Sequence, residues 1–152
     1  MSPRWLASNA VLAAVYAGLA LALPATAVAN YRLTTALYSL AAFNPRLIPG
    51  LALGNALAGL PQGPLDIVLG GGVGLLTSWL CSRVTPWASP LAILIVPTLV
   101  VPLWLGVLFA VPYQVVVPVL VRGQAASALL AWVVVVPLGH RFATTLRETT
   151  GA

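Results

Sequence analysis

Long apolar stretches make up most of this chain, and short polar or proline-containing segments separate them. The clearest breaks are Asn44-Pro45-Arg46 and PQGP at 61–64, which are typical of turns. A helix needs ~20 apolar residues to cross a bilayer, so 152 residues leave room for about six helices with short loops. The expected helices cover residues 5–24, 33–43, 46–60, 65–82, 88–109 and 123–141.

The composition places these helices in a membrane. The chain is 61% hydrophobic and 6% charged, with a mean hydropathy of +1.02, whereas soluble domains carry about 25% charged residues. The sequence therefore predicts an all-α integral membrane protein with one domain over residues 1–152 and the lipid bilayer around it. The net charge of +5 comes entirely from arginines that stand singly between apolar runs, so nucleic acid is not expected as a partner.

Few residues are available for chemistry. The chain has one histidine, one cysteine and two acidic residues far apart in sequence, so neither a metal site nor a catalytic set can be assembled. We expect no enzyme activity, no metal and no cofactor. A P-loop is excluded because the chain has no lysine, so any ATP hydrolysis must come from another polypeptide. Cys81 and His140 are interpreted as a small apolar filler and an interface residue.

The first apolar run has two interpretations. Arg4 followed by an apolar core and Ala27-Val28-Ala29 resembles a secretory signal peptide with a small-residue cleavage site. The core, however, runs for about 19 residues, and signal peptides usually have ~7–15. This length favours a retained first helix.

The arginines predict the topology. Residues 84–121 carry no charge and contain several prolines, so they hold either one span followed by an apolar loop or two short spans. One span gives the stronger positive-inside bias and puts both termini in the cytoplasm. Residues 110–121 then become an outer loop that is apolar enough to cover a pocket. With one span, the inner arginines are Arg4, Arg46, Arg83, Arg141 and Arg147, and the outer ones are Arg32 and Arg122.

This topology gathers polar side chains at the outer face. Asp66 is the most informative, because an unpaired carboxylate in a bilayer costs at least ~2.5 kcal/mol and usually touches a solute, a partner or water. The alternative is an acidic residue stabilised by the dipole at a helix start, since Asp66 closely follows Pro64. We expect a small-molecule site here. Its candidate residues are Tyr31, Arg32, Thr35, Tyr38, Asn55, Gln62, Asp66, Tyr113 and Gln114.

Small residues recur at four-residue spacing in the first helix, which lets another helix approach closely. The pairs are Ala10/Ala14, Ala13/Ala17 and Ala14/Gly18. Contact with a partner protein and packing within the chain both explain this pattern.

Three stretches carry a family resemblance. YRLTTAL at 31–37, IPGLALGNALAGL at 48–60 and PLDIVLGGGVGLLTSWL at 64–80 resemble motifs of the QueT family, the membrane substrate-binding (S) components of energy-coupling factor (ECF) transporters. The resemblance implies a six-helix bundle in the prokaryotic cell membrane with both termini cytoplasmic. It also implies as partners a transmembrane coupling protein, EcfT, and two ATPase subunits. The small-residue face of the first helix (Ala10, Ala13, Ala14 and Ala17) would meet the coupling protein, and toppling of the subunit would release the solute inside.

The resemblance also indicates which solutes the protein is expected to bind. QueT proteins are associated with queuosine precursors, which are deazaguanine-like bases, and relatives are associated with cobalamin. The chain departs from the family pattern at Thr35, Gly59 and Gly74, where the family has Glu, Asn and Thr. A queuosine precursor is the favoured solute, with Asp66 accepting hydrogen bonds from an ammonium or guanine-like edge and Tyr31 or Tyr113 stacking on the ring. Another vitamin, or a membrane assembly subunit without transport function, is the alternative.

Overall fold

The computed structural model describes residues 3–22, 33–109 and 112–141, and within these ranges every regular element is helical. The main segments of this part of the chain are five α-helices and one long 3-10 helix. They are α1 (Pro3–Ala22), η1 (Leu33–Ala42), α2 (Ile48–Ala58), α3 (Pro64–Arg83), α4 (Ser89–Phe109) and α5 (Tyr113–Leu130). Short 3-10 turns, η2 (Pro45–Leu47) and η3 (Leu60–Gln62), flank α2, and α5 continues through the π-helical turn η4 (Ala131–Val135) to Arg141.

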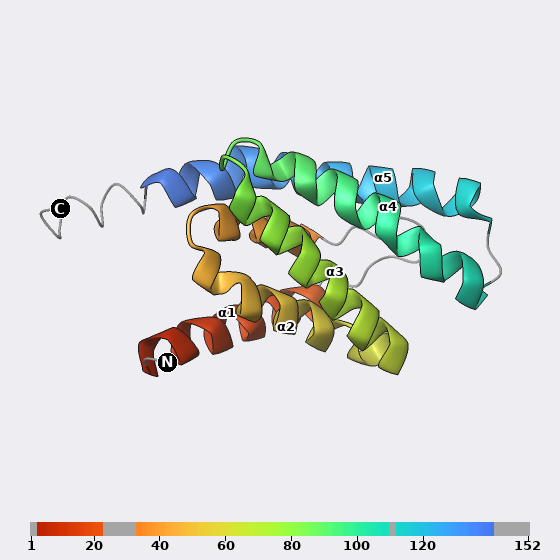
Figure 1. Cartoon of the computed structure of the whole chain (residues 1–152), viewed down its shortest axis with the longest axis horizontal. Helices are drawn as coiled ribbons and strands as arrows, with labels where there is room; N and C mark the ends of the chain where they lie inside the picture. Colours follow the sequence, from red (N-terminus) through yellow and green to blue (C-terminus); the bar gives the residue numbers. More distant parts are fainter. Residues whose placement is uncertain (1–2, 23–32, 110–111, 142–152) are drawn as a thin grey trace, which may run out of the picture.

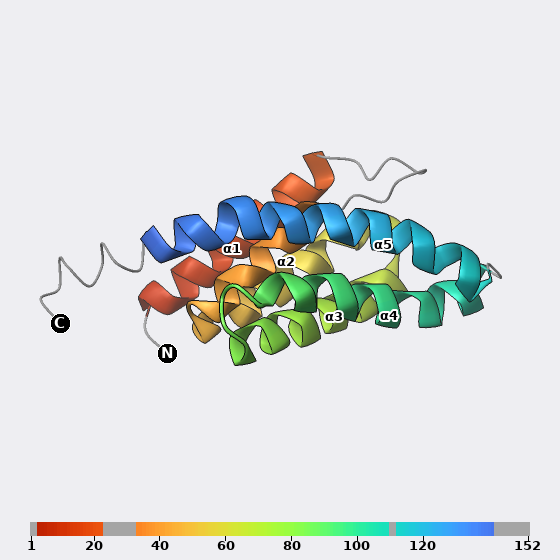
Figure 2. The same ribbon diagram turned by 90° about the horizontal axis from the view of Figure 1, so that it is seen from above.

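The helices pack with α4 and α5 side by side on one flank, α1 and α2 on the other, and α3 and η1 between them (Figure 1). The helices run mostly along the long axis, and seen from above the start of α1 and the end of the helix that continues α5 lie toward the same end (Figure 2). The start of α3 and the start of α5 lie toward the opposite end (Figure 1). The bundle therefore has one end that holds both described chain ends and another built from helix connections.

The surface of the bundle is apolar, as a bilayer requires. Within the described ranges, three helices are long and apolar enough to cross a membrane: Trp5–Ala22, Pro64–Arg83 and Tyr113–Arg141. Val11, Val68 and Leu103 are each more than 60% exposed, which would favour aggregation in water but suits contact with lipid. These features confirm the expectation of a helical membrane protein.

η1 is unusual because 3-10 helices seldom exceed three or four residues, whereas this one has ten. It lies in the middle of the bundle, where it contacts α3, α4 and α5. Side chains three residues apart are eclipsed on a 3-10 helix, so Thr35 and Tyr38 share one face. The surrounding helices supply the packing that this short element lacks by itself.

The predicted apolar loop at 110–121 is wrong. α4 is one helix, as the charge count favours, but α5 begins at Tyr113 and includes Pro118 in its interior. Pro112 precedes the first turn of α5, with an extended ψ of 136°. Prolines inside α4 and α5 had suggested chain breaks, yet membrane helices tolerate proline because neighbouring groups satisfy the freed carbonyls.

α1 and α2 approach closely at Gly54. A methyl group built there would lie 2.7 Å from Cβ of Tyr16 and 3.1 Å from the Ala13 carbonyl oxygen. Ala13 and Ala17 are buried in this chain, at 2% and 8% exposure, whereas Ala10 and Ala14 are exposed. This corrects the expectation that all four alanines form one partner-facing surface, because internal packing already uses Ala13 and Ala17.

The contact at Gly54 yields a stability prediction. Gly54→Ala adds a methyl group against the rigid Cβ of Tyr16, so we expect it to destabilise the fold by about 1–3 kcal/mol. Gly72→Ala is the matched control, because its Cβ would meet nothing within 4 Å and alanine favours helix by ~1 kcal/mol over glycine. Thermal unfolding in detergent measures both. A Gly54→Ala protein as stable as Gly72→Ala would contradict the close approach.

Candidate functional site

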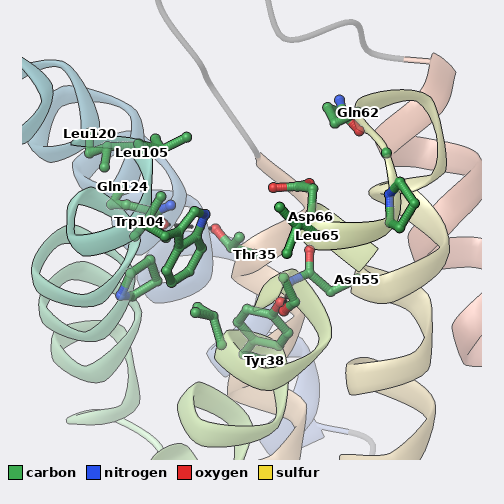
Figure 3. Close-up of a pocket in the computed structure, with 16 residues that line it drawn as sticks. Thr35, Tyr38, Asn55, Gln62, Leu65, Asp66, Trp104, Leu105, Leu120 and Gln124 are labelled. Atoms are coloured by element: carbon green, nitrogen blue, oxygen red, sulfur yellow. Dashed lines mark hydrogen bonds between the residues drawn. The ribbon is translucent and has the colours of Figure 1, made fainter. Parts of the chain in front are cut away.

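A cavity of about 670 Å³ opens between α3 and the α4–α5 pair, toward the end of the bundle opposite the described chain ends (Figure 3). Its size lies in the usual range for sites that hold small organic ligands, ~300–1,000 Å³. Residues from η1, α2, η3, α3, α4 and α5 line it. They are Thr35, Tyr38, Asn55, Gln62, Gly63, Pro64, Leu65, Asp66, Gly70, Val73, Pro97, Val101, Trp104, Leu105, Leu120 and Gln124.

The cavity has an apolar wall and a polar wall. On α4, Pro97, Val101, Trp104 and Leu105 recur at helical spacing, so one face of that helix supplies most of the apolar wall. Trp104 projects into the cavity from this side (Figure 3) and offers an indole surface for a flat ring. The polar side chains come from η1, α2, α3 and α5. Such a site suits a solute with one flat apolar face and several hydrogen-bonding groups.

Thr35 and Gln124 join η1 to α5 at the edge of the cavity. The Thr35 hydroxyl donates a hydrogen bond to Oε1 of Gln124 at 3.1 Å, and both side chains are buried. Because Oε1 is thus engaged, the Gln124 amide nitrogen is the group that can donate to a solute.

A hydrogen-bonded group lies beneath Thr35. The hydroxyls of Tyr38 and Tyr16 are 2.9 Å apart, and the Tyr16 hydroxyl donates to Oδ1 of Asn55 at 3.3 Å. Nδ2 of Asn55 donates to the carbonyl oxygen of Gly70. Tyr16, Tyr38 and Asn55 are at most 3% exposed. These bonds connect α1, η1, α2 and α3, and they fix the orientation of the two side chains, Tyr38 and Asn55, that line the cavity.

Asp66 lies in the first turn of α3, two residues after Pro64, and its carboxylate projects into the cavity (Figure 3). The positive end of the helix dipole stabilises a carboxylate in this turn. The two interpretations of Asp66, a solute-contacting residue and an acidic residue at a helix start, are therefore compatible. The first turn of α3 favours the charge of Asp66 and also directs its side chain to the cavity. Nearby, the Gln62 amide nitrogen can lie 3.1 Å from the carbonyl oxygens of Ala58 and Gly59, which leaves its oxygen to accept.

Of the candidate residues, five lie together around the cavity: Thr35, Tyr38, Asn55, Gln62 and Asp66. Tyr113 and Gln114 do not line it. They are exposed in the first turn of α5, because this helix begins where the sequence suggested a loop. The remaining candidates, Tyr31 and Arg32, lie outside the described residues.

Sequence reasoning missed the apolar wall and the role of Gln124. Gln124 is not among the candidate residues taken from the sequence, although a lone amide in a mostly apolar segment is itself a signal. The sequence could not identify Trp104 as a lining residue. α4 is apolar throughout, so its cavity face and its lipid face have the same composition.

Of the three departures from the family pattern, one lines this cavity and the other two lie next to side chains that line it. Thr35 lines it directly. A Cβ at Gly59 would lie 3.0 Å from Oδ2 of Asp66, and one at Gly74 would lie 3.0 Å from the Tyr38 hydroxyl. Side chains at these two positions would therefore crowd the polar groups of the site.

In the described part of the chain, no group of three or more His, Cys, Asp or Glu side chains that could hold a metal ion is found. Cys81 is fully buried and its thiol lies 3.6 Å from the Ser89 carbonyl oxygen, which fits the expected role as a packing residue. His140 packs against Phe43 and Trp87 and does not line the cavity.

The fold and the cavity define a helical membrane protein with a pocket for a small solute. A profile of the QueT transporter family matches residues 6–140, which is most of the chain. The chain therefore belongs to the QueT transporter family, and this membership supports a role in membrane transport. Comparisons with curated proteins and with solved structures found no match.

Two neighbouring threonines test the bond that closes the cavity edge. Thr35→Val removes the donor to Gln124 and leaves a buried carbonyl oxygen unsatisfied, so we expect a loss of about 1–3 kcal/mol in unfolding free energy. Thr34→Val is the matched control, since the buried Thr34 hydroxyl has no hydrogen-bond partner among the described residues. Thermal or denaturant unfolding in detergent compares them. Equal stability of the two variants would show that the Thr35 bond contributes nothing.

Proposed function

We propose that this chain is the substrate-binding membrane subunit, or S component, of an ECF-type importer in a prokaryotic cell membrane, with residues 1–152 as one domain. It captures a small vitamin or nucleobase-like solute at the outer face and releases it inside when the subunit topples. The single observation that carries the proposal is the 670 Å³ cavity with one apolar and one polar wall, inside a member of a transporter family.

The lining favours a queuosine precursor over cobalamin. A deazaguanine-like base has a flat ring for Trp104 and an edge of N–H donors for Asp66 and its polar neighbours. Trp104 takes the stacking role that the sequence had suggested for Tyr31 or Tyr113. Cobalamin is much larger than the ligands that pockets of this size enclose. The cavity thus supports the smaller solute.

The orientation with both termini in the cytoplasm is also part of the proposal. Arg46 is in η2, Arg83 ends α3 and Arg141 is the last described helical residue, and these element ends lie toward the end of the bundle that holds the described chain ends (Figure 1). Positive side chains are enriched on the cytoplasmic side of membrane proteins, which supports the proposal that this end faces the cytoplasm. The cavity then lies toward the outer end, where a solute enters.

ATP hydrolysis is assigned to partners, because the sequence has no lysine for a P-loop. The partners are the coupling protein EcfT and two ATPase subunits. The exposed Ala10 and Ala14, with Gly18 on the same helix face, provide a surface that another helix can approach closely. A membrane assembly subunit without transport function would also use such a surface, so solute binding separates the two functions.

The first test asks whether the charge of Asp66 contributes to solute binding. Asp66→Asn keeps the shape of the side chain but removes the charge, and charge-assisted hydrogen bonds contribute ~1.5–3 kcal/mol. We expect at least about tenfold weaker binding of an aminomethyl-7-deazaguanine. Glu148→Gln is the control, because it removes the other acidic residue of the sequence. Isothermal titration of purified protein measures both. Unchanged affinity in Asp66→Asn would remove Asp66 from the site.

The second test concerns the partners. Ala14→Leu adds bulk to the small-residue face of α1, so we expect most of the ATPase subunits to be lost from affinity-purified complexes after co-expression with EcfT. Val15→Leu is the control, since Val15 is exposed on the same helix outside that face. Solute affinity should be unchanged in both variants. A wild-type chain that binds no ATPase subunits and no solute would favour the assembly-subunit alternative.

A further inference from the structure

Arg83 ends α3 without an acidic partner among the described residues. It is exposed in the last turn of the helix, whereas Asp66, the one acidic residue of the described ranges, lies in the first turn. The helix between them is about 25 Å long at ~1.5 Å per residue, so the two side chains cannot pair. No described carboxylate therefore neutralises the positive charge of Arg83.

The Arg83 side chain lies over an aromatic ring. Its guanidinium carbon is 5.1 Å from the centroid of the Trp79 ring, one turn earlier in α3. This separation is within the ~6 Å over which a cation is attracted to an indole face. Tryptophan is enriched where lipid tails meet headgroups, and the 20 residues of α3, about 30 Å, match the thickness of the hydrocarbon. The pair thus belongs at the level of the lipid phosphates.

An apolar stripe runs from this pair along α3. Its exposed residues follow one another at three- and four-residue spacing, which places them on one face of the helix. They are Val68, Gly72, Leu75, Leu76, Trp79 and Arg83. A Cβ at Gly72 would meet nothing within 4 Å, so the stripe has no side chain between Val68 and Leu76. Gly72 is about 16 Å along the helix from Arg83, which is half the hydrocarbon thickness and the reach of one acyl chain.

The turn after α3 adds hydrogen-bond donors close to Arg83 in the sequence. Thr85 and Trp87 are exposed there, and Trp87 stacks on His140 with ring centroids 5.6 Å apart. A hydroxyl and an indole N–H can both donate to phosphate oxygens. This turn lies toward the end of the bundle that holds the described chain ends (Figure 1). An anionic headgroup at this place would meet a positive charge and several donors.

We propose that Arg83 and Trp79 form a binding site for one anionic phospholipid. The lipid phosphate pairs with the Arg83 guanidinium, whose N–H groups match two phosphate oxygens, and one acyl chain lies along the stripe over Gly72. A zwitterionic lipid brings an ammonium that Arg83 repels, so the site favours a lipid with net negative charge. The stripe shares no residue with the cavity lining, and the site is therefore independent of the solute.

Native mass spectrometry of the full chain, released from nanodiscs of equal phosphatidylglycerol and phosphatidylcholine, tests the site. We expect one phosphatidylglycerol to remain on the wild-type protein, and Arg83→Gln to lower its retention by at least about fivefold. Arg122→Gln is the matched control, since Arg122 is exposed on α5 and the same charge is removed. Equal retention in the two variants, or equal retention of both lipids by the wild type, would overturn the proposal.

A tryptophan pair separates this site from general attraction between positive residues and anionic lipid. Trp79→Leu keeps an apolar side chain but removes the ring under the guanidinium, so we expect retention of phosphatidylglycerol to fall about threefold. Trp132→Leu is the control, because Trp132 is exposed on the helix that continues α5. Thermal unfolding in detergent shows that each variant is folded. Retention in Trp79→Leu that equals retention in Trp132→Leu would also overturn the proposal.

Discussion

The buried hydrogen bonds among Tyr16, Tyr38, Asn55 and the Gly70 carbonyl are the constraint on which the rest of the structure depends. In lipid, apolar burial does not drive helices together, so packing and interhelical hydrogen bonds must hold them. Each of these polar groups would be costly if it lost its partner. Four elements therefore meet at one place, and the cavity lies directly beside it.

Glycine makes this meeting possible. Gly54 lets α1 reach α2 at the level of Tyr16, and Gly74 leaves room for the Tyr38 hydroxyl beside Asn55. The long 3-10 helix η1 then brings Thr35 and Tyr38 onto one face, because its side chains repeat every three residues. Helix packing and site geometry are thus produced by the same few residues. The departures at Gly59 and Gly74 matter for both, since larger side chains there would push against Asp66 and Tyr38.

The cavity connects the transport role to a class of solute. Its apolar wall comes from one face of α4, and its polar side chains come from η1, α2, α3 and α5. A solute buried here must match these polar side chains, because a polar group left unpaired on binding costs free energy.

Composition alone determined that the protein is helical and lies in a membrane, because so few charges leave no other stable environment for it. The sequence also indicated Asp66, Thr35, Tyr38, Asn55 and Gln62, since polar residues are few and conspicuous among apolar ones. It could not identify Trp104 or the start of α5 at Tyr113, because lipid-facing and core-facing residues are equally apolar and prolines do not end membrane helices reliably. Only the tertiary structure decided which alanines of α1 are buried, which face of α4 lines the cavity, and in which direction the Tyr16 hydroxyl donates. Those features depend on contacts between segments far apart in sequence, and no local pattern records them.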